Sequence, residues 1–178
     1  MSYLDGARLF NTSVATERSL SELATPFDVV SIALSKGLGC PVGSVIAGRA
    51  SDMIRAVRLR RMFGGAMRQS GILAAAGLFA LDNNIGRLAE DHANARILAE
   101  RLADTPVEID LATVQTNIVI FRLPEPLADA ATIVRRAQAR GVLVSAFAVR
   151  TVRAVTHLDI DAEQCRHAAE VLAQVVEA

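Results

Sequence analysis

One lysine stands out among the residues that could do chemistry. Of the 19 basic residues of the chain, 18 are arginine and only Lys36 is lysine. A guanidinium is never a free amine at neutral pH, so arginine cannot replace lysine in imine chemistry. Lys36 follows the apolar run 29–34 and begins a turn that contains two glycines and a proline. Because ligands of α/β proteins bind at strand ends, Lys36 could be an imine-forming amine, a phosphate contact or an exposed turn residue.

The segment around Lys36 is not a nucleotide-binding P-loop. No GxxxxGK[ST] pattern occurs in the chain, and Lys36 precedes its glycines instead of following them. Phosphate binding of the P-loop kind is therefore excluded for this turn.

A second polar group follows the first apolar run. Asp5 and Arg8 stand in the sequence YLDGAR, where Asp-Gly indicates a turn after a strand. Asp5 could cap this turn, or it could lie under a basic ring nitrogen and keep that nitrogen protonated. Arg8 could bind a carboxylate through both guanidinium branches, or it could be a surface residue. Turn capping is the commoner role of an aspartate before a glycine, and this motif alone is not diagnostic.

The elements that position these residues are predicted from apolar periodicity. After an opening strand that starts at Tyr3, we expect further strands at 29–34, 42–47, 107–109, 117–123, 142–144 and 151–156. We expect helices at 19–23, 51–62, 67–81, 84–103, 127–140 and 161–176. Ser19 with Glu22, and Asp161 with Gln164, are spaced as capping pairs. The chain is thus an α/β protein whose first part has too few strands to close a doubly wound sheet.

Composition excludes several classes of protein. Apolar residues make up 52% of the chain, aromatic residues only 4%, and the net charge is zero. A basic run at 55–61 could contact nucleic acid, but the zero net charge and the absence of interleaved aromatics argue against it. Two isolated cysteines indicate no disulfide framework or metal site. With no signal peptide and no long apolar span, we expect a cytoplasmic protein without a membrane or nucleic-acid partner.

Six segments together resemble the low-specificity L-threonine aldolases, within the aromatic amino acid β-eliminating lyase/threonine aldolase family. They are YLDGARLFN at 3–11, SIALSKGLGCPVGSVIAG at 31–48, RLRRMFGGAMRQSGILAAAGLFAL at 58–81, EDHANARILAERL at 90–102, QTNIVIF at 115–121 and VRAVTHLDI at 152–160. They follow the order of the family across nearly the whole chain. The resemblance implies the C-terminal part of a pyridoxal 5'-phosphate-dependent transferase of fold type I.

The architecture implied by this resemblance has two parts. Residues 1–103 would be the C-terminal part of the cofactor-binding large domain, and residues 104–178 a small C-terminal α/β domain. Members of the family are usually homotetramers built from catalytic dimers. The implied activity is the retro-aldol cleavage of L-threonine or L-allo-threonine to glycine and acetaldehyde.

The resemblance also implies a role for particular residues. Lys36 would bind the cofactor aldehyde through its amine, and Asp5 would pair with the pyridine nitrogen. Arg8 and Arg153 would hold the carboxylate of the amino acid substrate. By binding the carboxylate, the two arginines would fix which Cα bond lies perpendicular to the cofactor ring. Cleavage of the Cα–Cβ bond would thereby be selected.

Two further arginines are implied to lie on the phosphate side of the cofactor. Arg68 matches the arginine of the family's GGGMRQ motif and would lie near the phosphate, in its own or a neighbouring subunit. Arg61 stands where the family often has lysine and would assist there. Tyr3 replaces a usual histidine, and Ala66 replaces the third glycine of GGGMRQ.

The largest departure from the family is a missing N-terminal half. The LRSDT start, the TGTQAN-type phosphate-binding loop and the histidines that stack on the ring have no counterpart in the sequence. His92 and His167 are expected in helices, and His157 of THLD is expected to be structural. We therefore expect a chain that needs an N-terminal partner segment; the alternative is a non-catalytic remnant that folds or oligomerises without cofactor.

Overall fold

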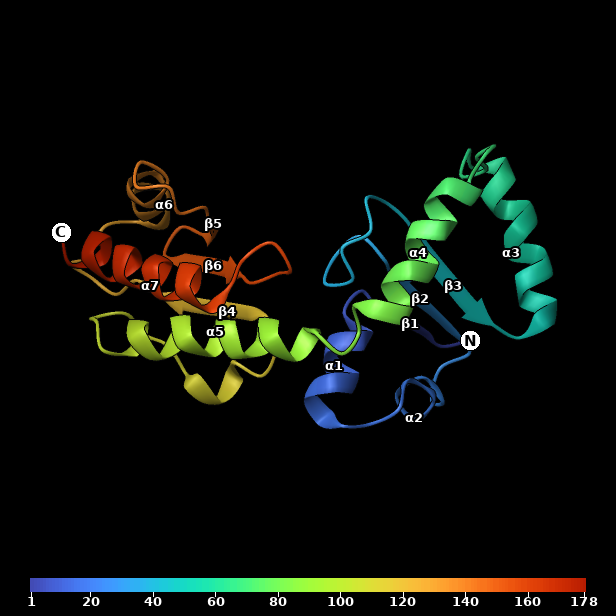
Figure 1. Cartoon of the computed structure of the whole chain (residues 1–178), viewed down its shortest axis with the longest axis horizontal. Helices are drawn as coiled ribbons and strands as arrows, with labels where there is room; N and C mark the ends of the chain where they lie inside the picture. Colours follow the sequence, from blue (N-terminus) through green and yellow to red (C-terminus); the bar gives the residue numbers. More distant parts are fainter. The chain divides into compact units, whose positions relative to one another are not determined.

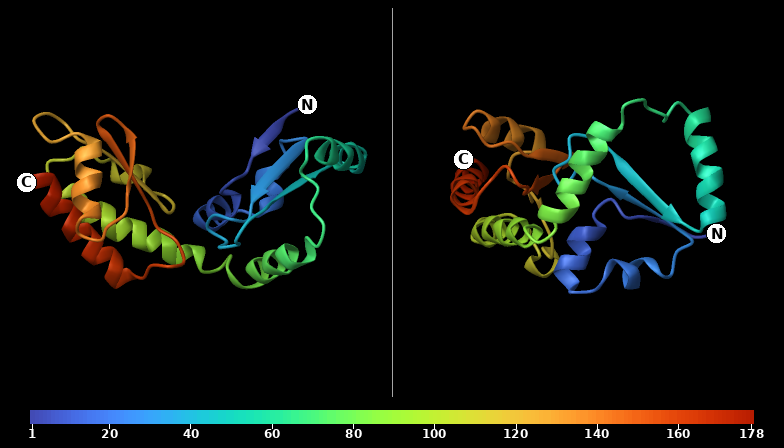
Figure 2. Two further views of the ribbon diagram at one scale, coloured as in Figure 1. Left: turned by 90° about the horizontal axis from the view of Figure 1, so that it is seen from above. Right: turned by 45° about the vertical axis from the view of Figure 1, so that its right-hand side comes forward.

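The computed structural model describes residues 1–178 and divides into two compact units, Met1–Leu88 and Ala89–Ala178 (Figures 1 and 2). Each unit combines a three-stranded sheet with helices, so the α/β class predicted from the sequence is confirmed. The second unit takes in most of the helix that the sequence placed before residue 104. As a division between the domains of a larger enzyme, the boundary at 103/104 stays a prediction.

The first unit contains a short mixed sheet and four helices. Its elements are β1 (Tyr3–Asp5), α1 (Leu9–Thr16), α2 (Leu20–Ala24), β2 (Val29–Ala33), β3 (Ser44–Gly48), α3 (Ala50–Met62) and α4 (Gly71–Asn83). The strand order is β1-β2-β3; β1 runs parallel to β2, and β3 runs antiparallel to it. Since β1 and β2 are parallel, the loops that follow them leave the sheet at the same edge.

The core of the first unit gathers around the loop between β2 and β3. Leu38 and Cys40 of that loop are buried with Phe10 of α1, Ala80 of α4 and Leu88. These apolar side chains come from four separate stretches of sequence, so their burial fixes the loop to α1 and α4 by apolar contact.

The second unit is a three-stranded antiparallel sheet with three α-helices and one short 3-10 helix. Its elements are α5 (Leu88–Ala103, whose first residue belongs to the first unit), η1 (Leu111–Thr113), β4 (Ile118–Arg122), α6 (Ala130–Gln138), β5 (Ser145–Ala148), β6 (Thr151–Val155) and α7 (Ala162–Glu177). The strand order is β4-β6-β5, with both neighbouring pairs antiparallel. One face of this sheet is buried, because Val119, Phe121, Val152 and Ala154 are buried whereas Ile120 between them is exposed.

The three helices form a layer on the buried face, with α7 in the middle (Figure 2, right). Arg101 of α5 pairs with Glu170 of α7 at 2.7 Å, and Arg136 of α6 donates to the carbonyl of Val175 at 3.3 Å. Asp161 and Gln164 form the predicted capping box at the start of α7. The other predicted pair, Ser19 with Glu22, caps α2 in the same way.

Three elements differ from the sequence prediction. Helix α1 was not predicted, because its sequence LFNTSVAT is rich in residues of low helix propensity. The strand expected at 142–144 lies instead at Ser145–Ala148, since Gly141 turns the chain at φ +80° and residues 142–144 run without ladder bonds. The strand expected at 107–109 is reduced to one isolated bridge between Glu108 and Arg122.

No helix is long and apolar enough to be a candidate for crossing a bilayer.

The register of β4 predicts unequal effects of two neighbouring substitutions. Phe121 is 1% exposed and faces the helices, whereas Ile120 is 44% exposed on the other face. We expect Phe121→Ala to lower the free energy of unfolding by about 3–5 kcal/mol, through lost burial and a cavity. Ile120→Ala should lower it by less than about 1 kcal/mol. Urea denaturation followed by circular dichroism measures both; equal losses would show that the two faces are wrongly assigned.

Candidate active site

Lys36 lies at the edge of the first sheet where β1 and β2 both end. It comes three residues after the last residue of β2, and its side chain is exposed and makes no hydrogen bond or ion pair. The backbone around it is ordered by a turn, in which the Gly39 amide donates to the Lys36 carbonyl at 2.9 Å and Gly39 has a φ of +73°. The Cys40 amide closes the loop on the carbonyl of Leu34 at 3.1 Å. The single lysine is therefore an accessible amine on a defined turn.

Asp5 and Arg8 stand at the same edge, after the neighbouring strand. Asp5 is the last residue of β1 and is paired in register with Ser31 of β2. Its Oδ1 accepts the amide of Ala7 at 3.2 Å, so the turn-capping role considered from the sequence is present. Arg8 is half-buried at the N-terminal end of α1. The parallel pairing thus brings Asp5, Arg8 and Lys36 to one edge of one sheet.

Gly6 allows the two strand ends to approach closely. Its amide donates to the Ser31 carbonyl at 2.8 Å. A Cβ on Gly6 would lie 2.6 Å from that oxygen, which is closer than real Cβ contacts. Only glycine fits this position without moving the backbone between Asp5 and Arg8.

A pair of hydroxyl groups lies beside Asp5 on the sheet. The Tyr3 hydroxyl and the Ser31 hydroxyl are 2.7 Å apart and share a hydrogen bond. Tyr3 and Asp5 are two residues apart on β1, so they point to the same face, and Ser31 is the register partner of Asp5. Tyr3 therefore adds a polar group on the same face of the sheet as Asp5.

Arg61 and Arg68 lie on a different part of the first unit. Arg61 is in the last turn of α3, and Arg68 is in the connection between α3 and α4. Both side chains are exposed, and neither makes a hydrogen bond or ion pair to Lys36 or Asp5. The structure does not by itself join these two arginines to the edge that carries Lys36.

Helices α3 and α4 and the connection between them expose many apolar side chains. Helix α3 has no buried residue, and α4 buries only Gly77 and Ala80. The large apolar residues exposed on the two helices and their connection are Ile54, Val57, Leu59, Met62, Phe63, Met67, Ile72, Leu78, Phe79 and Leu81. Helix α4 is apolar on nearly all sides, and such a helix is normally buried, whereas α3 also has four arginines. A contiguous exposed apolar surface of this kind is typical of an interaction surface.

Arg153 belongs to the second unit. It lies on β6, paired with Ile120 of β4 and Ser145 of β5, on the face opposite the helices. Its side chain is half-exposed on this open face. The arginine is thus available to a ligand on the side of the sheet that this unit leaves uncovered.

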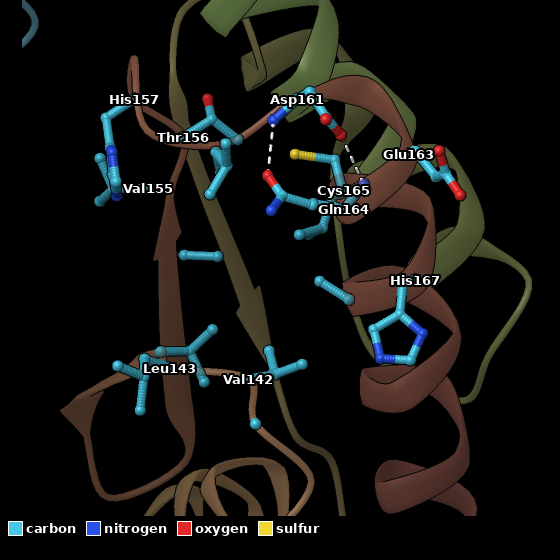
Figure 3. A pocket seen from close by; sticks show the side chains of 16 residues that line it. Val142, Leu143, Val155, Thr156, His157, Asp161, Glu163, Gln164, Cys165 and His167 are labelled. Atoms are coloured by element: carbon cyan, nitrogen blue, oxygen red, sulfur yellow. Dashed lines mark hydrogen bonds between the residues drawn. The ribbon is translucent and has the colours of Figure 1, made fainter.

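The second unit also contains a hollow of about 690 Å³, at the start of α7 and the end of β6 (Figure 3). Its walls include Val142, Leu143 and Val155, and His157, Gln164 and Cys165 lie at its polar end. None of the six residues predicted to bind cofactor or substrate lines it. Burial raises the pKa of the Cys165 thiol, and the carboxylates of Asp161 and Asp91 raise it further, so this thiol is a poor nucleophile.

The histidines give no sign of forming a catalytic base. Burial lowers the pKa of His92 on α5. His157 Nδ1 lies 3.2 Å from the carboxylate of Asp159, two residues along the same loop. His167 is exposed on α7. No group of three or more histidine, cysteine, aspartate or glutamate side chains could hold a metal ion.

The residues at the edge of the first sheet fit one kind of cofactor. An accessible primary amine can bind an aldehyde, and a nearby carboxylate can keep a basic ring nitrogen protonated. Lys36 and Asp5 supply these two groups from neighbouring parallel strands. The donor set therefore suits pyridoxal phosphate, which carries an aldehyde and a pyridine nitrogen.

Comparison with known proteins identifies the family of the chain. Residues 2–126 match the family described as beta-eliminating lyase. The chain is 48% identical to the low specificity L-threonine aldolase of Escherichia coli O157:H7, over 91% of this chain and 47% of that protein. It is 43% identical to low-specificity L-threonine aldolase 1 of Arabidopsis thaliana, over 69% of this chain and 35% of that protein. The chain thus spans about half the length of these relatives or less.

Solved structures share the fold. A threonine aldolase of Leishmania major matches 98% of this chain with a TM-score of 0.71 and 19% identity, and 51% of that chain is covered. Plasmodium falciparum ornithine δ-aminotransferase matches 99% of this chain with a TM-score of 0.67 and 14% identity, and 48% of that chain is covered. These matches confirm the predicted fold class, part of the type I fold of pyridoxal-phosphate enzymes.

The close approach at Gly6 predicts a strong effect of one added methyl group. Gly6→Ala should lower the free energy of unfolding of the first unit by about 1–3 kcal/mol, because the Ser31 carbonyl must move to make room. Gly71→Ala is the matched control, since a Cβ there meets nothing within 4 Å. This control should cost nothing, or stabilise α4 by up to about 1 kcal/mol. Denaturant unfolding of both variants measures these changes. A Gly6→Ala variant with the free energy of unfolding of the wild type would contradict the close packing of the two strand ends.

Proposed function

Because the chain belongs to the beta-eliminating lyase family, we propose that it is the C-terminal part of a pyridoxal-phosphate-dependent threonine aldolase. The observation that carries this proposal is the placement of Lys36 and Asp5 at the shared carboxyl edge of β1 and β2. The reaction proposed is the cleavage of L-threonine or L-allo-threonine to glycine and acetaldehyde. The 48% identity to a low specificity L-threonine aldolase supports this substrate class.

In this proposal, the exposed amine of Lys36 would bind the cofactor aldehyde. When bound, pyridoxal phosphate accepts the electrons released as the Cα–Cβ bond of a β-hydroxy amino acid breaks. The Asp5 carboxylate keeps the proton on the ring nitrogen by opposite charge. Asp5 is suited to this task because the Ala7 amide and the strand pairing hold its position.

Arg8 and Arg153 are proposed to bind the carboxylate of the substrate. A guanidinium binds a carboxylate with two parallel hydrogen bonds, which fixes the orientation of the amino acid as well as its position. Fixing the carboxylate sets which Cα bond is aligned for cleavage, and so favours retro-aldol cleavage over decarboxylation. Arg68 and Arg61 are proposed to lie near the cofactor phosphate, in the same or a neighbouring subunit.

We propose that the remaining parts of the site come from an N-terminal segment, either as a separate partner chain or as part of the same protein. This segment carries the phosphate-binding loop and the residues that move the β-hydroxyl proton, in an assembly that is a homotetramer in the cytoplasm. The apolar surface of α3 and α4 supports a covering partner, since ten large apolar side chains are exposed there. Neither a membrane nor a nucleic acid is part of the proposal.

Reductive trapping tests whether Lys36 holds the cofactor. The chain has one lysine, so Lys36 and the α-amino group are its only primary amines. After incubation with pyridoxal phosphate and borohydride, peptide mass spectrometry should find the adduct on Lys36 in preference to the α-amino group. The preference should disappear in the urea-unfolded chain. In the Lys36→Arg variant, the α-amino adduct should be the only one that forms. Equal labelling of both amines in the folded chain would mean a remnant that does not bind cofactor.

Complementation tests the reaction itself. Mixing the chain with the N-terminal half of the Escherichia coli O157:H7 relative should produce glycine and acetaldehyde from L-threonine, and Lys36→Arg should remove the activity. In the active mixture, Arg8→Lys and Arg153→Lys should raise KM for threonine about ten- to a hundredfold, because a bidentate contact to a charged group is lost. Arg122→Lys is the control, since Arg122 is an exposed neighbour paired with Glu108. KM values unaffected by the first two changes would remove both arginines from the substrate site.

A further inference from the structure

The loop that carries Lys36 accepts a hydrogen bond from the side chain of Asn84, a residue that no sequence motif pointed to. Asn84 is the residue that follows α4, and its Nδ2 donates to the Leu38 carbonyl at 2.8 Å in a partly buried contact. Asn84 is itself fixed, because its backbone amide donates to the Ala80 carbonyl at 2.8 Å. The end of α4 is therefore connected to the loop through one amide group.

Two further contacts leave the loop little room to move. The Cys40 thiol donates to the Ala76 carbonyl of α4 at 3.6 Å. Gly37 lies against α1 and the residue before the second unit: a Cβ there would be 2.9 Å from Leu88 Cδ2 and 3.2 Å from Asn11 Oδ1. Leu38 is 2% exposed and Cys40 is 7% exposed, whereas Lys36 is exposed.

The carbonyl that Asn84 holds lies within the turn that begins at Lys36. The Gly39 amide donates to the Lys36 carbonyl, so residues 36–39 form one turn. The peptide between Leu38 and Gly39 contains both the carbonyl bound by Asn84 and the amide that closes the turn. Holding this peptide in one orientation fixes the turn, and thereby the direction in which the chain presents Lys36.

We propose that Asn84 is a positioning residue for Lys36, acting through the Leu38 carbonyl. The proposal rests on the proposed function, in which Lys36 binds the cofactor aldehyde. Asn84 touches neither cofactor nor substrate; it keeps the amine-bearing turn in the orientation that the reaction with an aldehyde requires. Without this donor, the turn samples other orientations, and the Leu38 carbonyl loses its partner in a partly buried place.

Two substitutions and one matched control separate this role from a general loss of stability. Asn84→Ala removes the side-chain amide, and Asn84→Asp keeps its shape but replaces the donor by an oxygen that repels the Leu38 carbonyl. Asn83→Ala is the control, because Asn83 is the adjacent asparagine and its Nδ2 donates at 2.8 Å only to Phe79 of its own helix. All variants are compared at a temperature where circular dichroism shows them fully folded.

The first measurement is borohydride trapping with pyridoxal phosphate. The quantity compared is the ratio of Lys36 labelling to α-amino labelling in the same chain. Asn84→Ala and Asn84→Asp should lower this ratio about two- to tenfold, the factor expected from one lost hydrogen bond. Asn83→Ala should leave the ratio unchanged. A purely structural role for Asn84 would lower the unfolding temperature but leave the ratio at its wild-type value, and this result would overturn the proposal.

The second measurement does not involve the cofactor. Cys40 lies in the loop and Cys165 lies in the second unit, and both thiols are free and buried. The Asn84 variants should increase the rate of alkylation of Cys40 by iodoacetamide relative to Cys165, because the loop opens more often. If pyridoxal phosphate labels Lys36 of the wild type no more than the α-amino group, the proposed function fails. The rate of Cys40 alkylation then decides by itself whether Asn84 holds the loop. An unchanged Cys40 rate in both Asn84 variants would overturn the proposal in either case.

Discussion

The first unit depends on a single loop that must satisfy two demands at once. Lys36 has to be exposed, while Leu38 and Cys40, two and four residues later, are central residues of the hydrophobic core. The left-handed conformation of Gly39 and the turn closed on the Lys36 carbonyl make this reversal possible within four residues. Because the same loop supplies both the amine and the core, the packing of α1 and α4 determines where the amine lies. The stability of this unit and the position of its lysine amine are therefore coupled.

The arginines show the opposite arrangement, since their positions depend on surfaces that this chain does not complete. Arg61 lies on α3 and Arg68 in the connection to α4, where large apolar side chains are exposed, and Arg153 lies on the open face of the second sheet. Large contiguous apolar surfaces are rarely left exposed to water and usually mark an interaction site. The covering surface would also determine which ligand these guanidinium groups can reach.

The sequence was informative where a local pattern and burial agree. The apolar run before Lys36 predicted β2 because a strand buried between neighbours needs apolar side chains on both faces. The capping pair at Asp161 predicted the start of α7 because the bonds involved are local. Helix α1 was missed because tertiary packing of Leu9 and Phe10, not helix propensity, stabilises it. The role of Asn84 has no local signal, because its acceptor on Leu38 is 46 residues away in the sequence.

The two interpretations of Asp5 that the sequence left open are compatible in the structure. Capping the turn uses Oδ1, which accepts the Ala7 amide at 3.2 Å. An ionised carboxylate has two oxygens and accepts about four hydrogen bonds, so one amide does not saturate it. The amide instead restricts rotation of the side chain and leaves acceptor capacity on the carboxylate for a protonated ring nitrogen. The turn is thus the support that would make Asp5 an effective counter-charge, because a carboxylate that is already held loses less entropy when it pairs with a ligand.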